Sequence, residues 1–198
     1  MVPAVVESPA PPAVTPAELG RDVLERCRRR DPVAFRAFVG RYERPVFALL
    51  SRILGRGPHV EDLAQETFLR AFRAFPKFDL DARARPSTWL LTIATRLALD
   101  ARKRATLTLV PIDAAANVGG AATPETERAR AELRTSIERA AAALPEDQRV
   151  AFVLAEFHAL SIAEIAAIVE APEATVKTRL FRARARLQAS LGNLVEEP

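Results

Sequence analysis

Residues 160–187 have the sequence LSIAEIAAIVEAPEATVKTRLFRARARL, and this stretch decides the fold of the C-terminal part of the chain. Ser161 and Glu164 form a capping box, in which each side chain can accept a hydrogen bond from the other residue's backbone N–H at the start of a helix. The apolar residues of this helix share one face: Ile162, Ile165, Ala166 and Val169. Because Glu170-Ala171-Pro172 cannot continue the helix, we expect a turn there.

A second helix is predicted to begin near Glu173. Its apolar residues recur at about 100° per residue and form one stripe: Val176, Leu180, Ala183, Leu187 and Leu191. The opposite face carries Thr178 and Phe181, flanked by Lys177, Arg182 and Arg184. This is the layout of a helix-turn-helix, whose second helix enters a DNA major groove. A helical hairpin with a solvated basic face is the alternative, but such a face has no use for an exposed phenylalanine.

The N-terminal half contains a helix after Pro58 with the sequence EDLAQETFLRAF over residues 61–72. Three phenylalanines are expected to face the core: Phe68, Phe72 and Phe75. The opposite face carries the charged residues Asp62, Glu66, Arg70 and Arg73. Leu63 lies at the border of this face, and Gln65 is placed nearer the apolar side. A solvated face with an ion pair between Glu66 and Arg70 would explain the charges, whereas an apolar residue beside exposed charges indicates a protein interface.

A further helix is predicted over residues 87–103. Its core face consists of Leu90, Ile93, Ala94, Leu97 and Ala101. A neighbouring face holds Trp89, Thr92, Arg96 and Lys103. A ring that stacks on bases, together with cations that hold phosphates, is typical of binding to unpaired nucleic acid. The alternative is that Trp89 is a partly buried core residue.

The helical patterns predict an all-α protein with two small helical domains. Residues 1–20 are rich in proline and alanine and are expected to be a disordered tail. The first domain is predicted over residues 21–104 and the second over residues 128–192. The pattern of the last ~65 residues indicates four short helices. Between them, residues 105–127 have the Gly, Pro and Ala content of a flexible linker. Residues 193–198 form a second tail.

Composition limits the classes of function. The formal net charge is +4, and basic residues outnumber acidic ones locally in two stretches, 83–104 and 173–188, as two nucleic-acid contacts would require. The single cysteine, Cys27, cannot form an internal disulfide, and we interpret it as a packing residue in a reducing compartment. No cluster of metal ligands, no cofactor motif, no signal peptide and no apolar run of membrane-spanning length is evident. A cytoplasmic protein without a cofactor is therefore expected.

Several of these motifs together resemble bacterial sigma factors. LPEDQR (144–149), LSIAEIA (160–166) and ATVKTRLFRAR (174–184) are similar to sigma region 4, which reads the −35 promoter element. EDLAQETFLRAF is similar to region 2.2, which grips a coiled coil of the largest RNA polymerase subunit. RPSTWLLTIATRLALD (85–100) resembles regions 2.3 and 2.4, which melt and read the −10 element. Two motifs in this order, with nothing but a linker between them, resemble the extracytoplasmic-function class.

The resemblance implies a role for each set of residues. Core polymerase would be bound by Asp62, Leu63, Gln65, Glu66 and Arg70. The −10 element would be melted and read by Arg85, Ser87, Thr88, Trp89, Thr92, Arg96 and Lys103. The −35 element would be read by Thr175, Lys177, Thr178, Phe181, Arg182 and Arg184. The family commonly has asparagine where this chain has Arg96, so the −10 bases that are recognised do not follow from the resemblance.

The implied partners are core RNA polymerase, double-stranded and melted promoter DNA, and an anti-sigma factor, which could hold the protein at a membrane without insertion. Two rival functions stay open at the level of sequence. One is a helix-turn-helix regulator that does not bind polymerase, against which the patch at Asp62, Leu63 and Glu66 argues. The other is an enzyme with a ligand-binding helical domain, for which the sequence offers no nucleophile–base pair and no phosphate-binding loop.

Overall fold

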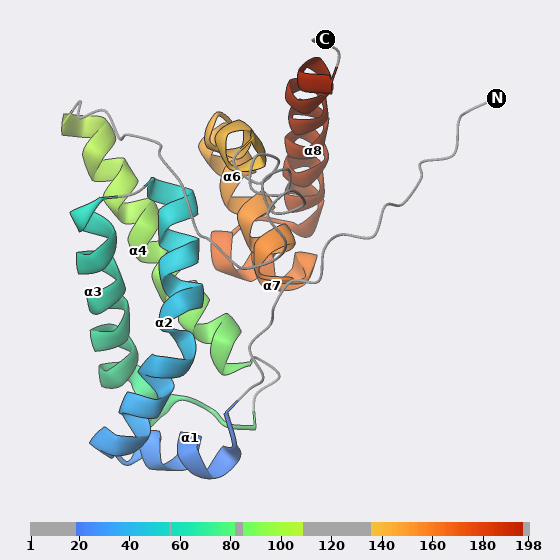
Figure 1. Cartoon of the computed structure of the whole chain (residues 1–198). Helices are drawn as coiled ribbons and strands as arrows, with labels where there is room; N and C mark the ends of the chain where they lie inside the picture. Colours follow the sequence, from blue (N-terminus) through green and yellow to red (C-terminus); the bar gives the residue numbers. More distant parts are fainter. Residues whose placement is uncertain (1–18, 56, 82–84, 109–135, 196–198) are drawn as a thin grey trace, which may run out of the picture.

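The computed structural model describes residues 19–55, 57–81, 85–108 and 136–195, and every regular element within those ranges is helical. Helices α1–α4 form an N-terminal domain, and α6–α8 form a C-terminal domain that lies beside it (Figure 1). The all-helical fold with two domains is therefore confirmed. In chain order the elements are α1 (Arg21–Arg28), α2 (Pro32–Leu54), α3 (Pro58–Ala74), the short η1 (Phe75–Lys77), α4 (Pro86–Thr108), a helix over residues 136–142, α6 (Glu146–Phe152), the π-helical η2 (Val153–Phe157), α7 (Ile162–Val169) and α8 (Glu173–Val195).

The helix boundaries of the N-terminal domain follow from local sequence signals. Asp31 caps α2, because its carboxylate accepts hydrogen bonds from the backbone N–H groups of Val33 and Ala34 at 2.8 and 3.2 Å. Gly55 ends the same helix with a φ of 82°, a left-handed conformation that favours glycine. Pro58 then occupies the first turn of α3, where its missing N–H leaves no hydrogen bond unmade.

Aromatic side chains fill the core of the N-terminal domain. Phe38 of α2 meets Phe75 edge-on, with ring centroids 5.0 Å apart, and Tyr42 lies 4.7 Å from Phe38. All three rings are almost completely buried. Helices α2, α3 and α4 pack against one another in pairs around them, and α1 crosses the end of α2 and touches η1. The edge-on geometry of the Phe38–Phe75 pair adds to the free energy that burial alone provides.

Helix α4 buries one broad face. Leu90, Leu91, Ala94, Thr95 and Ala98 are all buried, and at about 100° per residue they lie within one arc of roughly 140°. Helices α2, α3 and α7 all contact α4. A broad apolar stripe of this kind is typical of a helix that packs against several neighbours.

The C-terminal domain is organised by the stretch from Leu160 to Leu187. The capping box is present: the N–H of Ser161 donates to Glu164 Oε2 at 2.8 Å, and the N–H of Glu164 donates to Ser161 Oγ at 3.3 Å. Glu170 ends α7 in the left-handed conformation, with φ 52°. The predicted stripe of α8 is buried at Val176, Leu180, Ala183 and Leu187, while Leu191 is half-buried.

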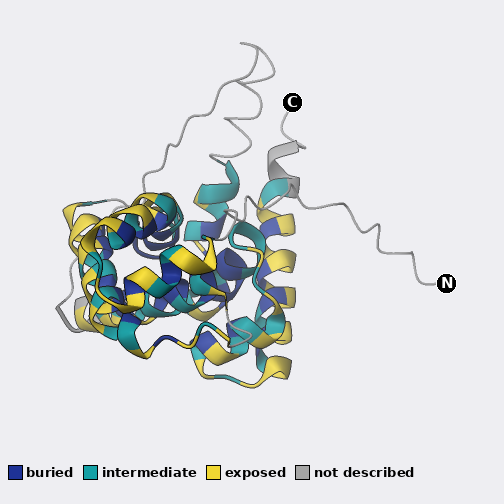
Figure 2. Cartoon of the chain, turned by 90° about the horizontal axis from the view of Figure 1, so that it is seen from below, coloured by how far each residue is buried: buried dark blue, intermediate teal, exposed yellow. Residues whose placement is uncertain are grey.

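The two domains share one hydrophobic core. Buried side chains from α2 and α4, such as Leu50, Ile53 and Leu91, belong to the same contiguous cluster as Leu154 and Ile165 of the C-terminal domain. Helix α2 contacts η2 and α6, and α4 contacts α7. Figure 2 shows buried residues in the interior of both parts. This packing between the domains was not predictable from the sequence.

Two predicted boundaries and the predicted length of one helix need correction. Helix α4 begins at Pro86 and continues to Thr108, so the linker predicted over residues 105–127 starts too early. Helix α8 spans 23 residues, so it is not short, and it extends to Val195 into the predicted tail over residues 193–198. The rest of the predicted linker, the start of the second domain and most of both tails lie outside the described residues.

Candidate polymerase- and nucleic-acid-binding surfaces

The first candidate surface lies on the outer side of α3, and we call Asp62, Leu63, Gln65, Glu66 and Arg70 the α3 patch. Asp62, Gln65 and Arg70 are exposed, and Glu66 is half-buried. Glu66 and Arg70 form an ion pair at 2.7 Å along the helix, as the solvated-face interpretation predicted. The four polar residues are thus brought together on one accessible surface.

The structure changes the roles of two members of this patch. Gln65 is exposed, so its predicted position nearer the apolar side is wrong. The buried face of α3 is centred on small residues, Val60, Ala64, Thr67 and Ala71, and not on the phenylalanines that served to locate it. Leu63, at the edge of this face, is half-buried and packs against the core.

The exposed apolar residue on this surface is Leu69, which the sequence-based assignment missed. Its exposed fraction is 42%. It lies four residues after Gln65 and seven after Asp62, so all three share one face of α3. That spacing was the signal from which it could have been found. An exposed leucine between an amide and a carboxylate suits a protein interface better than the half-buried Leu63 does.

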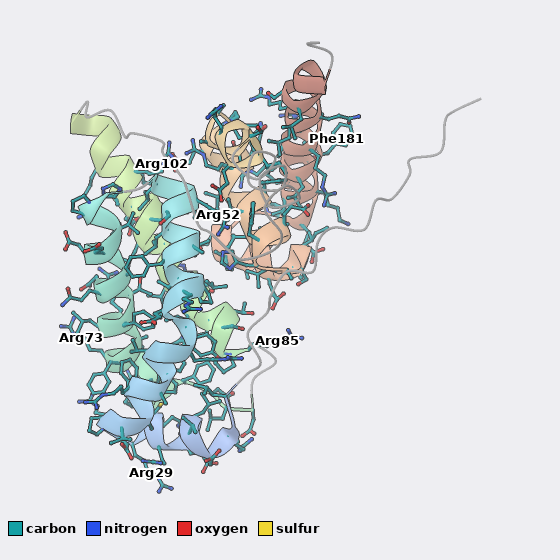
Figure 3. All side chains as sticks on the ribbon, in the orientation of Figure 1. Arg29, Arg52, Arg73, Arg85, Arg102 and Phe181 are labelled. Atoms are coloured by element: carbon teal, nitrogen blue, oxygen red, sulfur yellow. The ribbon has the colours of Figure 1, made fainter. Side chains whose placement is uncertain are left out.

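The second candidate surface is the outer face of α8, and we call Thr175, Lys177, Thr178, Phe181, Arg182 and Arg184 the α8 face. Phe181 is 73% exposed and points away from the domain core (Figure 3). Lys177 and Arg182 are exposed on either side of it and form no ion pair with any described residue. This arrangement confirms that the basic and aromatic residues of α8 lie opposite its apolar stripe.

Other members of the α8 face are already engaged. The Thr178 hydroxyl donates to the carbonyl of Ala174 at 2.9 Å. Arg184 forms an ion pair with Glu156 at 2.7 Å within the same domain. Thr175 is only half-exposed. The side chains that are most available for a ligand are therefore Lys177, Phe181 and Arg182.

The third candidate surface runs along α4 from the residue before its start, and we call Arg85, Ser87, Thr88, Trp89, Thr92, Arg96 and Lys103 the α4 face. Trp89 is half-buried, with its ring centroid 5.3 Å from Phe75 and 4.8 Å from Phe78. It therefore packs against the aromatic core, as the alternative interpretation held. Arg85, Arg96 and Lys103 are exposed, while Ser87 and Thr88 are buried.

Two residues of the α4 face contact the C-terminal domain. Thr88, only 6% exposed, donates its hydroxyl to Glu164 Oε1 at 3.0 Å. Arg96 forms an ion pair with Glu170 at 3.0 Å. Glu164 is the capping residue of α7, and Glu170 is the residue that ends α7. Both ends of this short helix are therefore attached to α4.

Arginines hold the other end of the contact between the domains, a role that was not predictable from the sequence. Arg102 of α4 donates to the carbonyl of Ile53 at 3.0 Å and pairs with Glu146 at 2.9 Å. Arg149 donates to the same carbonyl at 3.3 Å. Two guanidinium groups thus meet the C-terminal end of α2, where the helix dipole favours cations. Figure 3 shows Arg52 and Arg102 on the side of the N-terminal domain that faces the C-terminal domain.

Burial and charge shift several pKa values at this contact. Burial acts to raise the pKa of Glu164, but hydrogen bonds from Ser161 and Thr88 outweigh it, so that this pKa lies below its usual value. Burial, and then the nearby charge of Arg102, lower the pKa of Arg149. Burial, and then the charge of Arg52, lower the pKa of His158 to about 4. His158 is therefore neutral at physiological pH.

The described ranges hold neither a candidate metal-ion site nor a candidate membrane-spanning helix. The residues described there contain no group of three or more His, Cys, Asp or Glu side chains that could hold a metal ion. Within those same ranges, no helix is both long enough and apolar enough to span a bilayer.

Comparison with known families matches both domains separately. The model for sigma-70 region 2 matches residues 38–108, and the model for sigma-70 region 4 matches residues 134–187. The first match contains the α3 patch and the α4 face, and the second contains the α8 face.

Comparison with whole proteins gives relatives of the same length. The ECF RNA polymerase sigma-E factor of Escherichia coli is 35% identical over 183 residues, which cover 87% of this chain and 94% of that protein. The RNA polymerase sigma-H factor of Pseudomonas aeruginosa is 32% identical over 190 residues, covering 91% and 97%.

Solved structures agree on the fold. The sigma factor RpoE of Bartonella quintana, in complex with the anti-sigma factor NepR, matches with a TM-score of 0.65 at 23% identity, covering 80% of this chain and 96% of that one. CnrH, in complex with the cytosolic domain of CnrY, matches with a TM-score of 0.60 at 26% identity, covering 87% and 97%.

Proposed function

The chain belongs to the extracytoplasmic-function (ECF) group of sigma-70 factors and is an RNA polymerase sigma factor, and we propose that its three surfaces divide the work of promoter recognition. The α3 patch binds core polymerase, the α8 face reads the −35 element, and the α4 face holds the melted −10 element. The observation that carries this proposal is the separation of the three surfaces on different helices, each with the chemistry that its ligand requires.

The α3 patch is suited to a protein partner. Its exposed Asp62 and Gln65 and its Glu66–Arg70 pair lie beside the exposed Leu69 on the same helix. Apolar contact provides affinity at such a surface, and charges provide the rate and orientation of association. The core of the domain is on the opposite side of α3, so changes in this patch should leave the fold intact.

Titration of core polymerase tests this assignment. We expect Asp62→Ala with Glu66→Ala to weaken binding about tenfold, which corresponds to ~1.4 kcal/mol, and we expect Leu69→Ala to weaken it as well. Glu43→Ala, at an exposed glutamate of α2, is the matched control. Native circular dichroism with unchanged polymerase affinity in the double variant would remove the α3 patch from the interface.

The α8 face is suited to the major groove of a duplex. Lys177 and Arg182 can donate to guanine edges or to phosphates, and the ring of Phe181 can contact thymine methyl groups. A contact to a base edge changes the preference among sequences by ~1–3 kcal/mol, whereas a contact to phosphate weakens all sequences alike. Measuring Lys177→Ala and Arg182→Ala across a library of −35 sequences separates these cases. Wild-type binding by both variants on every sequence would refute the assignment.

The α4 face supplies cations for unpaired DNA at Arg85, Arg96 and Lys103. Since Trp89 packs against Phe75 and Phe78, its first role is to hold α4 on the aromatic core. Only the part of its ring that stays exposed can stack on bases. Transcription with core polymerase and a mapped start site is the experiment that tests the whole proposal. A regulator that never binds polymerase would give no transcript in that assay.

Partners and location follow from the same assignment. An anti-sigma factor is the expected inhibitor, since one structural relative, the sigma factor RpoE of Bartonella quintana, is bound to one. We place the chain in the cytoplasm, where its polymerase is, with membrane attachment only through such a partner. The polymerase supplies the chemistry of RNA synthesis, so the chain needs neither catalytic residues nor a cofactor of its own.

A further inference from the structure

Arg184 belongs to the α8 face, yet its guanidinium is bound to a carboxylate of its own domain. Its Nη2 and Nε both donate to Glu156 Oε1, at 2.7 and 3.1 Å. We propose that Glu156 is a positioning residue that keeps this guanidinium off the phosphate backbone of DNA, so that α8 meets a duplex without the charge of Arg184. This inference rests on the proposed function of the α8 face.

The place of Arg184 on the helix would otherwise suit a contact with DNA. Lys177 lies seven residues before it and Phe181 three residues before it, so the three side chains leave α8 on the same side. All three are exposed, and Phe181 points away from the domain core (Figure 3). From this side a guanidinium could donate to a phosphate next to the groove that α8 enters.

Glu156 is well placed to compete with a phosphate. It lies in η2, which continues from α6, and α6 packs against α8. Its side chain is only 23% exposed, so it is held more firmly than a solvated glutamate. A carboxylate and a phosphate are both anions that accept charge-assisted hydrogen bonds from a guanidinium. The two N–H groups of Arg184 that bind Glu156 cannot bind a phosphate in the same geometry.

A second arginine of α8 is also held by an acid, but it is much less accessible. Arg179 Nε donates to Asp147 Oδ2 at 3.1 Å. The side chain of Arg179 is 26% exposed, whereas that of Arg184 is 63% exposed. Of the two paired arginines, Arg184 is therefore the one that DNA could reach if its acid were removed.

Holding Arg184 lowers the attraction of α8 for DNA of any sequence. A phosphate contact strengthens binding to all sequences alike and adds about 1 to the slope of log K against log salt concentration. Withholding this contact reduces binding to random DNA and leaves the preference among sequences to the other residues of the α8 face. Non-promoter DNA then retains the chain less strongly.

Binding of the full chain to a short fluorescent duplex of random sequence, measured by anisotropy at several salt concentrations, tests this role. We expect Glu156→Gln to bind on the order of twofold to fivefold more tightly than the wild type, with a salt slope steeper by about 1. Arg184→Ala should bind like the wild type, and adding it to Glu156→Gln should abolish the gain. A variant that had merely lost structure would not bind more tightly with a steeper salt dependence.

Glu173→Gln is the matched control, because it removes one negative charge at an exposed glutamate of α8 that pairs with no described residue. Its binding should stay close to that of the wild type. Weaker binding by Arg184→Ala would show that Arg184 already contacts DNA. An equal gain in the double variant, or in Glu173→Gln, would show simple repulsion by the removed charge. Either result overturns the proposal, as does the absence of a gain in Glu156→Gln.

The same assay distinguishes this inference from the proposed function. If Lys177→Ala and Arg182→Ala weaken binding while Glu156→Gln changes nothing, only the role of Glu156 fails. If neither alanine variant weakens binding, α8 does not contact DNA and both proposals fail. Across the library of −35 sequences, Glu156→Gln should give the same gain on each one. A gain confined to some sequences would place Arg184 at base edges and overturn its assignment to phosphate.

Discussion

At the scale of single residues, Trp89 shows how a side chain can belong to both the core and a functional surface. Its neighbours on α4 are cations, which suggested a ring available to bases. Its ring nevertheless packs on Phe75 and Phe78. Trp89 lies in the first turn of α4, and Phe75 and Phe78 pack against it there, so its ring cannot be fully open to solvent.

We expect Trp89→Ala to lower the free energy of unfolding by ~3 kcal/mol, the lower end of the range for a large buried aromatic, because the residue is half-buried. Trp89→Phe keeps a ring on Phe75 and should retain most of that stability. Urea denaturation followed by far-UV circular dichroism measures both. An unchanged midpoint in Trp89→Ala would show that the ring contributes no packing and would return it to the DNA-binding surface.

His158 is a second residue whose surroundings make a testable difference. The residue is half-buried, but its Nε2 is fully buried and has no hydrogen-bond partner in the part of the chain that the structure describes. Burial, followed by the charge of Arg52, lowers its pKa from 6.5 to about 4. The unfolded chain therefore binds a proton more readily than the folded chain does.

The stability of the protein should consequently decrease as the pH falls from about 6.5 towards 4. Above that window His158 is neutral in both the folded and the unfolded chain, so its titration no longer lowers the stability. With ~1.4 kcal/mol per pKa unit, the loss can reach ~3 kcal/mol. Melting temperatures of the wild type and of His158→Gln across this window test the expectation. The glutamine variant should lose less stability on acidification, and parallel curves for the two proteins would exclude His158 as the source.

At the scale of elements, the capping box of α7 is the local feature with the widest effect. Ser161 and Glu164 start the helix, and Glu164 also accepts from Thr88 of the other domain. The same carboxylate thus joins the start of a helix to the packing of two domains.

Ser161→Ala removes the N-cap acceptor and should lower the free energy of unfolding by ~1 kcal/mol. Ser190→Ala, at an exposed serine of α8 that caps no helix, is the control and should have little effect. Thermal unfolding of both variants gives the comparison. If the two substitutions had equal effects, the Ser161 hydrogen bond would contribute nothing beyond the change of side chain.

Most helix starts and the stripe of α8 were predictable from sequence, because they depend on residues within one or two turns. The ends of α4 and α8 were not, and the buried Ile168 lies outside the stripe predicted for α7. Asp31-Pro32, Gly55 to Pro58 and Ser161 with Glu164 are examples of such signals. The face of α3 was harder. The bulky phenylalanines suggested which side faces inward. In the structure the small Ala64 and Ala71 lie on the buried side, because they allow the helices to approach closely, and Gln65 and Leu69 are exposed.

At the scale of the whole molecule, the contact between the domains could not be predicted. Arg96 and Glu170 are far apart in the sequence, and each is a charged residue of the kind expected on a solvated helix face. Their pairing depends on the position of α7 along α4, which the shared apolar cluster and the arginines at Ile53 determine together. Candidate residues were therefore correctly located on their helices, but their accessibility was not.

A single shared core predicts that the two domains unfold together. Trp89 is the only tryptophan of the chain and lies in the N-terminal domain, whereas Leu154 is fully buried in the C-terminal domain. Leu154→Ala should cost ~2–5 kcal/mol. Because loss of the C-terminal domain also removes its contacts with α2 and α4, the unfolding transition seen by Trp89 fluorescence should move to lower urea, together with the far-UV signal. Arg184→Ala, which breaks an exposed pair within the C-terminal domain, should barely move either signal. If Trp89 fluorescence kept its wild-type midpoint in Leu154→Ala while helicity was lost earlier, the domains would unfold independently and their contact would add no measurable stability.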